Sequence, residues 1–217
     1  MRAFQLKKGP EEKLTILCLG AHSDDIEIGC GGTILRLSGE HRNLEVVWVV
    51  FCAEGQREEE ARRSADLFLR GVASKRVILH AYRDGFLPFV GAEVKDRFEQ
   101  LKSVVAPDIV FTHYRDDRHQ DHRLLSDLAW NTFRDHLILE YEIPKFDGDF
   151  GTPNFFVALD ERVIEEKIKL VLSTFASQKS KHWFTGDTFS AIARLRGIES
   201  GGQTRFAEAF YSRKLVF

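Results

Sequence analysis

The sequence predicts a three-layer α/β fold in which helices cover both faces of a mostly parallel sheet. Short apolar runs alternate with amphipathic segments, and parallel strands need such crossover segments to connect them. The run at residues 44–51 is almost continuously apolar, as expected of a central strand that is buried on both faces. A length of 217 residues suits one domain with a sizeable core, so we expect residues 1–217 to form a single domain.

The first elements are predicted from hydrophobic periodicity. Residues 14–19 are rich in strand formers and predict the first strand. The glycine-rich stretch 20–32 is expected to be a long loop that leads into a helix at 33–37. After the strand at 44–51, residues 58–69 predict another helix, because apolar side chains recur on one stripe and charged ones lie opposite.

The later elements follow from the same patterns. Strands are predicted at 77–79 and 109–111, and the charged amphipathic segment 93–105 between them predicts a helix that ends before Pro107. A second clear amphipathic helix is predicted at 161–174. Extended segments are predicted in the second half of the chain at 137–143, 154–158 and 206–217.

Charge and hydropathy exclude several kinds of partner. The chain has 31 Lys and Arg against 33 Asp and Glu, a net charge of −2, so it offers no basic footprint for nucleic acid or anionic lipid. The longest strongly apolar run, 46–53, is far too short to span a membrane, and the N-terminus lacks a signal-peptide core. We therefore expect a cytoplasmic location. Whether identical chains assemble into an oligomer stays open.

The three cysteines are predicted to be reduced thiols in the core. Cys18, Cys30 and Cys52 are odd in number, irregularly spaced and set in apolar stretches. That pattern fits neither a disulfide framework nor a cysteine-rich zinc cluster.

Polar residues gather after two of the predicted strands, where the ligands of an open parallel sheet bind. The stretch 22–27 follows the first strand, and the stretch 113–122 follows the strand at 109–111. His22 and Asp25 are three residues apart, as are His119 and His122, which brings each pair to one side of a turn. Two imidazoles and a carboxylate leave positions open for water and substrate, the pattern of catalytic zinc.

The two neighbouring carboxylates of the first stretch are expected to divide the work. Asp24 and Asp25 cannot easily face one ion together, so one would ligate and the other would act as a base on water. The alternative is a purely structural role, in which such residues cap helices, form turns or lie on the solvated surface. Two clusters at the same end of one sheet favour a site. His113 is expected to pack at its strand end instead of ligating.

These residues resemble the PIG-L or LmbE-like family of metal-dependent de-N-acetylases. The stretch 21–33 reads AHSDDIEIGCGGT against the family's A-H-P-D-D-x-E-x-G-x-G-G, and 117–122 reads DRHQDH against H-x-D-H. The resemblance implies a Rossmann-like fold. Weaker similarity continues over most of the chain, at 54–57, 84–85, 140–145, 194–197 and 207–210.

The resemblance implies a role for each matching position of the two main motifs. His22, Asp25 and His122 would bind Zn²⁺, with Fe²⁺ or another divalent metal as alternatives. Asp24 would be the general base that takes a proton from a zinc-activated water.

Further residues would assist the reaction. His119 would stabilise the oxyanion or protonate the leaving amine, and Asp121 would orient His119 and favour its imidazolium form. Arg57 and Asp84 would contact the substrate. The expected reaction is removal of the N-acetyl group from an amino sugar such as N-acetylglucosamine, free or in a glycoconjugate.

The sequence departs from the family pattern at two positions. Ser23 stands where the family often has Pro, which removes no ligand, and Phe206 stands where many members carry Tyr, which removes a hydroxyl. A further set of aromatic side chains could stack on a sugar ring or pack in the core or a lid: Phe86, Phe89, Phe146, Phe150 and Trp183.

Two other functions share the same residues. A non-haem Fe(II) oxygenase also uses two histidines and one carboxylate, although it needs no additional base beside the metal. A carbohydrate-binding domain without turnover would keep the fold, although every ligand and base position is filled here.

Overall fold

A computed structural model describes residues 8–202 and 204–215. It contains one seven-stranded sheet in the order β3-β2-β1-β4-β5-β7-β6. Strands β3, β2, β1, β4 and β5 are parallel to their neighbours in this series, whereas β7 is antiparallel to both β5 and β6. The strands are β1 (Leu14–His22), β2 (Leu44–Cys52), β3 (Ser74–Leu79), β4 (Ile109–His113), β5 (Leu137–Tyr141), β6 (Phe155–Leu159) and β7 (Phe206–Ser212).

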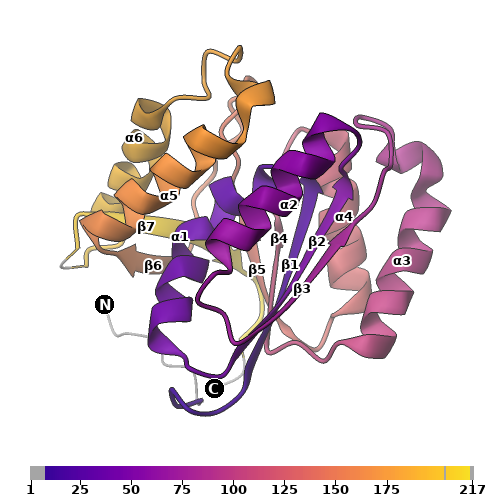
Figure 1. Ribbon diagram of the computed structural model, residues 1–217, viewed down its shortest axis with the longest axis horizontal. Helices are drawn as coiled ribbons and strands as arrows, with labels where there is room; N and C mark the ends of the chain where they lie inside the picture. The colour runs from indigo at the N-terminus through magenta and orange to yellow at the C-terminus, as the bar shows by residue number, and fades with distance from the viewer. Residues whose placement is uncertain (1–7, 203, 216–217) are drawn as a thin grey trace.

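Helices cover both faces of this sheet, as Figure 1 shows. The helices on one face are α1 (Asp25–Glu40), α2 (Gln56–Phe68), α5 (Glu161–Thr174) and α6 (Gly186–Glu199). The opposite face carries α3 (Gly91–Val104) and α4 (Gln120–Thr132). Two short 3₁₀ turns, η1 (Leu87–Val90) and η2 (Ala176–Gln178), complete the set of described helices. None of the described helices combines the length and apolar character needed to cross a membrane.

The core consists of two apolar layers separated by the sheet. Along β1, Ile16 and Cys18 join the layer under α1, α2 and α5, whereas Leu17 and Leu19 join the layer under α3 and α4. This alternation follows from the two-residue period of a strand. It explains why the central strands are apolar at almost every position.

The architecture confirms the predicted α/β fold with a mostly parallel sheet between two helical layers. The expected loop at 20–32 is wrong, because β1 continues to His22 and α1 begins at Asp25. The glycines there let α1 approach its neighbours closely. A Cβ built on Gly29 would lie 2.2 Å from the Tyr141 ring, and one built on Gly31 would lie 2.6 Å from Phe68. No prediction was made for α4 or α6.

A buried ion pair connects α1, α5 and β7. The Lys167 ammonium donates to Glu208 Oε1 and to the carbonyl oxygen of Ile28, each at 2.6 Å. Glu208 also accepts the backbone N–H groups of Gly32 and Thr33 at 2.8 and 2.6 Å. Both charged side chains are buried, at 7 and 5% exposure. The pair therefore holds the backbone of α1 at Ile28, Gly32 and Thr33.

Replacement of Glu208 by Gln should lower the free energy of unfolding by about 3 kcal/mol, because it leaves the Lys167 ammonium buried without a counter-charge. The matched control is Glu161→Gln, since Glu161 pairs with Arg205 at 3.3 Å on the exposed surface. That change should cost less than about 1 kcal/mol. Urea unfolding of both variants measures the difference, and equal losses would refute the structural importance of the buried pair.

Candidate metal centre

The candidate centre lies at the carboxyl ends of β1 and β4, which are neighbours in the sheet. The chain runs from β1 outwards to β2 and β3, and from β4 outwards to β5, so the strand order reverses between β1 and β4. Ligands of open α/β sheets bind at such a switch point. Here α1 begins directly after β1, and α4 begins seven residues after β4.

Three side-chain atoms from these two connections face one point. His22 Nδ1 lies 3.1 Å from His122 Nε2 and 3.3 Å from Asp25 Oδ2, and His122 Nε2 lies 3.5 Å from Asp25 Oδ2. Two donors held tetrahedrally at about 2.0–2.1 Å from one cation lie about 3.4 Å apart. The spacing of these atoms and their nitrogen and carboxylate chemistry therefore fit one divalent cation.

A carboxylate on the far side of the His122 ring binds Nδ1, which leaves the lone pair of Nε2 facing the candidate centre. His122 Nδ1 donates to Asp117 Oδ2 at 2.9 Å, so the lone pair of neutral His122 is on Nε2. Burial, reinforced by the charge of His113, lowers the pKa of His122 to about 3, which keeps the ring neutral. Asp117 also pairs with Lys145 at 2.9 Å. Although burial acts to raise it, the hydrogen bond from His122 and the ammonium of Lys145 hold the pKa of Asp117 well below its usual range.

His22 is oriented in the same way by two other carboxylates. Its Nε2 lies 3.0 Å from Asp84 Oδ1 and 3.3 Å from Asp121 Oδ2, so this nitrogen carries a proton and Nδ1 faces the candidate centre. Asp121 is held by backbone N–H groups of Gly85 and Leu87 at 2.7 and 3.1 Å. Burial opposes protonation of His22, but Asp25, Asp121 and Asp84 outweigh it and raise its pKa well above the usual value.

The expected pairing of Asp121 with His119 is therefore corrected. The Asp121 carboxylate contacts His22, and His119 meets only the backbone N–H of Asp121, which donates to His119 Nδ1 at 3.3 Å. Burial and the charge of His22 lower the pKa of His119, and they outweigh the charge of Asp121, which acts to raise it. The physical reason is that Asp121 lies in the first turn of α4, and its side chain points back to the end of β1.

Asp24 lies beside this cluster and is held by Arg57. The Arg57 guanidinium donates from Nη2 to Asp24 Oδ1 at 2.8 Å and from Nη1 to Ser177 Oγ at 3.2 Å. Burial acts to lower the pKa of Arg57, but the charge of Asp24 raises it. Among the described residues, no donor engages the second oxygen of Asp24. Arg57, which the sequence predicts to contact the substrate, therefore contacts the predicted base, Asp24, directly.

These groups line a cavity of about 430 Å³. The polar and charged lining residues include His22, Asp24, Asp25, Glu54, Arg57, Arg83, Asp84, His119, His122, Lys145, Gln178 and Lys181. Asp84, the other expected substrate contact, exposes 76% of its side chain, and its hydrogen bond from His22 lowers its pKa to about 2. Among the five aromatic candidates for sugar stacking, only Trp183 lines the cavity.

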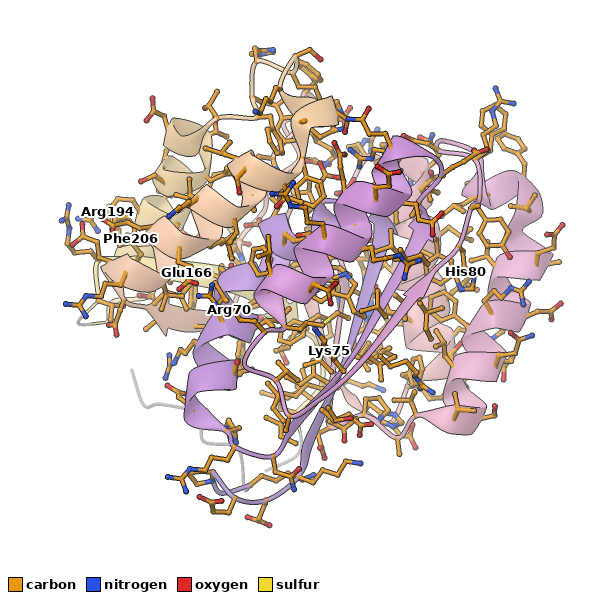
Figure 2. The ribbon with its side chains drawn as sticks, viewed as in Figure 1. Arg70, Lys75, His80, Glu166, Arg194 and Phe206 are labelled. Carbon is orange, nitrogen blue, oxygen red and sulfur yellow. The ribbon has the colours of Figure 1, made fainter. Side chains whose placement is uncertain are left out.

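Three further residues of the sequence analysis lie outside the ligand set. His113 Nε2 accepts the backbone N–H of Ala21 at 2.9 Å, its ring stacks on His122, and the same nitrogen lies 3.3 Å from Asp25 Oδ2. Cys52 is buried in the cavity wall, and burial raises its pKa to about 12. Phe206 does not line the cavity, and Figure 2 shows it at the outer edge of the molecule, near Arg194.

Sequence reasoning missed several residues that support the site. Asp117 stands inside the stretch 113–122, five residues before His122, but its spacing alone assigns it no role. Lys145 had only the weak signal of the similar segment 140–145. Nothing in the sequence points to Ser177 or Gln178, because η2 reaches the site through its tertiary contacts with α2.

Comparison with known proteins identifies related sequences. A family model described as PIG-L, GlcNAc-PI de-N-acetylase, matches residues 17–133, which is more than half of the chain. The uncharacterized deacetylase YaiS of Escherichia coli K12 is 29% identical over 185 residues, covering 76% of this chain and 90% of that protein.

Solved structures share the fold. The conserved protein TT1542 of Thermus thermophilus has 23% identity and a TM-score of 0.70, over 94% of this chain and 96% of that one. The N,N'-diacetylchitobiose deacetylase of Pyrococcus horikoshii has 24% identity and a TM-score of 0.67, over 97 and 87%. GalB of Pseudomonas putida, a 4-carboxy-2-hydroxymuconate hydratase, has 16% identity and a TM-score of 0.67, over 94 and 98%. The fold therefore supports more than one reaction, and the reaction must be argued from the site.

The Asp117→Asn variant should bind a divalent cation about 10- to 100-fold more weakly, because the carboxylate that orients His122 is lost. Titration of metal against a chromophoric chelator measures the affinity. The control is Asp116→Asn, whose exposed side chain lies 3.9 Å from Arg213 and is expected to leave the affinity unchanged. Equal affinities of the wild type and Asp117→Asn would show that Asp117 does not support the centre.

Proposed function

The chain belongs to the PIG-L family of de-N-acetylases, and from this premise we propose that it is a zinc-dependent hydrolase acting on an N-acetylated amino sugar or glycoconjugate. One observation carries the proposal. Two inward-facing imidazole nitrogens and a carboxylate oxygen converge within 3.5 Å, with a second carboxylate, Asp24, beside them in the same cavity. This combination supplies both a metal site and a base, as hydrolysis of an amide requires.

His22, Asp25 and His122 would hold the zinc ion. Two nitrogens and one carboxylate oxygen match the donor set of catalytic zinc, and Fe²⁺ or another divalent cation can use the same donors. When bound, the cation would act as a Lewis acid toward the acetyl carbonyl and make a water molecule more acidic.

Asp24 is the proposed general base. Arg57 engages Oδ1, which fixes the carboxylate plane and leaves Oδ2 to take a proton from water as the remaining hydroxide attacks the acetyl carbon. The guanidinium also places a positive charge beside the oxyanion that develops.

His119 is proposed to stabilise the oxyanion. Its Nδ1 accepts the N–H of Asp121, so the neutral ring carries its proton on Nε2 and can donate a hydrogen bond to the oxyanion. Asp24, protonated by the water, would pass that proton to the amide nitrogen as the C–N bond breaks, which returns Asp24 to its ionised form. The products are a free amino sugar and acetic acid, which ionises to acetate in solvent.

The rest of the cavity supports recognition of a sugar. Asp84 uses Oδ1 for His22, and its largely exposed carboxylate can accept a hydroxyl hydrogen bond with Oδ2. Trp183 lines the same cavity and offers an aromatic ring on which a sugar can stack.

The Asp24→Asn variant should lose acetate release by a factor of about 10²–10⁴ while its metal content stays near one ion per chain. Acetate is measured over a panel of N-acetylated sugars, and metal is measured by elemental analysis. The control is Glu54→Gln, which neutralises another carboxylate of the cavity wall and should keep most of the activity. Loss of the metal together with activity would show that Asp24 is a ligand and not the base.

Removal of the metal by a chelator should abolish acetate release, and added Zn²⁺ should restore it. The reason is that the cation is the Lewis acid proposed to polarise the amide carbonyl.

Further measurements separate the two alternative functions. Iron in protein purified without added metal, together with oxygen consumption, would favour an Fe(II) oxygenase. Sugar binding by calorimetry with no acetate released under any metal would favour a binding domain without turnover.

A further inference from the structure

The segment that follows β5 is joined to the connection between β4 and α4 by the carboxylate of Asp149. Asp149 Oδ2 lies 2.5 Å from Lys145 Nζ and accepts the backbone N–H of Arg118 at 2.7 Å. Gly148, whose φ of +60° favours glycine, turns the chain between the two charged residues. The side chains of Lys145 and Asp149 are only 10 and 9% exposed. Because charges that are largely buried need a partner, each of these two side chains depends on the other.

The same ammonium reaches the carboxylate that orients a proposed metal donor. Lys145 Nζ lies 2.9 Å from Asp117 Oδ2, and this oxygen also accepts Nδ1–H of His122 at 2.9 Å. The other oxygen of Asp117 accepts the backbone N–H of His119 at 2.7 Å. Lys145 and His122 therefore share one oxygen atom, and the two donors compete for its negative charge.

Asp149 decides how the charge of Lys145 is divided. With Asp149 in place, the ammonium lies between two carboxylates, so the group as a whole stays negative and Asp117 keeps charge for His122. Without Asp149, Asp117 is the only carboxylate left to the ammonium among the described residues. A carboxylate that is less negative is a weaker acceptor for Nδ1–H, and the opposite nitrogen of the ring becomes a weaker donor to a cation.

We propose that Asp149 is a positioning residue of the metal centre, which draws the Lys145 ammonium away from Asp117 and so keeps His122 oriented and electron-rich. The inference rests on the proposed function, because it requires that a divalent cation binds at the candidate centre. Asp149 lies beyond residues 17–133, the part that matches the family model. The segment after β5 thus contributes to the strength of a metal site whose donors all lie earlier in the chain.

The test is the affinity of Asp149→Asn for Zn²⁺, titrated against a chromophoric chelator. We expect an affinity about three- to tenfold lower than that of the wild type, because the amide keeps the shape of the side chain and loses its charge. The matched control is Asp147→Asn, since Asp147 lies on the same segment with an exposed side chain. It should bind Zn²⁺ as the wild type does.

A double variant shows whether Asp149 acts through Asp117. In an Asp117→Asn background, the added Asp149→Asn change should lower the Zn²⁺ affinity by less than about twofold, because the route to His122 is already broken. If the loss in the double variant equals the product of the two single losses, Asp149 acts independently of Asp117 and the inference is overturned.

Thermal unfolding of the metal-free proteins tests for a merely structural role. A variant whose metal-free Tm falls while the folded protein keeps the wild-type Zn²⁺ affinity would assign Asp149 to stability alone and overturn the inference. A wild type that binds no Zn²⁺ refutes the proposed metal centre itself. That outcome is distinct from a wild type and Asp149→Asn that bind Zn²⁺ equally tightly, which refutes only the role of Asp149.

Discussion

The arrangement of the site depends on carboxylates that hold the outer nitrogens of two histidines. Asp117 occupies Nδ1 of His122, and Asp121 with Asp84 occupies Nε2 of His22. Each imidazole therefore turns its remaining nitrogen inward, toward Asp25. Without these contacts the rings could rotate or carry their protons on the other nitrogen, and the same residues would not form a ligand set.

The fold supplies the rigidity that this arrangement requires. Asp25 is the first residue of α1, so the position of that helix decides where its carboxylate lies. Gly29 lets the helix press on the Tyr141 ring, whose hydroxyl donates to the Leu19 carbonyl of β1 at 2.7 Å. Lys167 and Glu208 hold the backbone of the same helix. Contacts outside the cavity thus position the Asp25 carboxylate inside it.

The layers of the fold and the residues that meet at the cavity could be predicted from the sequence. The hydrogen-bond partners of these residues could not. Apolar runs and crossover lengths reveal a parallel sheet, and residues after its strands must meet at one end. The partner of Asp121 could not be predicted, because the choice between His119 and His22 depends on where the first turn of α4 lies relative to β1. The helical conformation of the glycines in α1 could not be predicted, because composition shows their flexibility and not the packing that requires them.

The cavity is built from two parts of the chain. Residues 17–133 supply His22, Asp24, Asp25, Arg57 and His122, whereas the cavity wall is completed by later residues such as Lys145, Gln178 and Trp183. The two parts are joined where Arg57 contacts both Asp24 and Ser177. Since a hydratase shares the fold, the sheet and helices do not by themselves determine the reaction. A change in the segment around η2 would therefore leave the proposed metal donors in place, and through Ser177 and Arg57 it would reach Asp24, the proposed base.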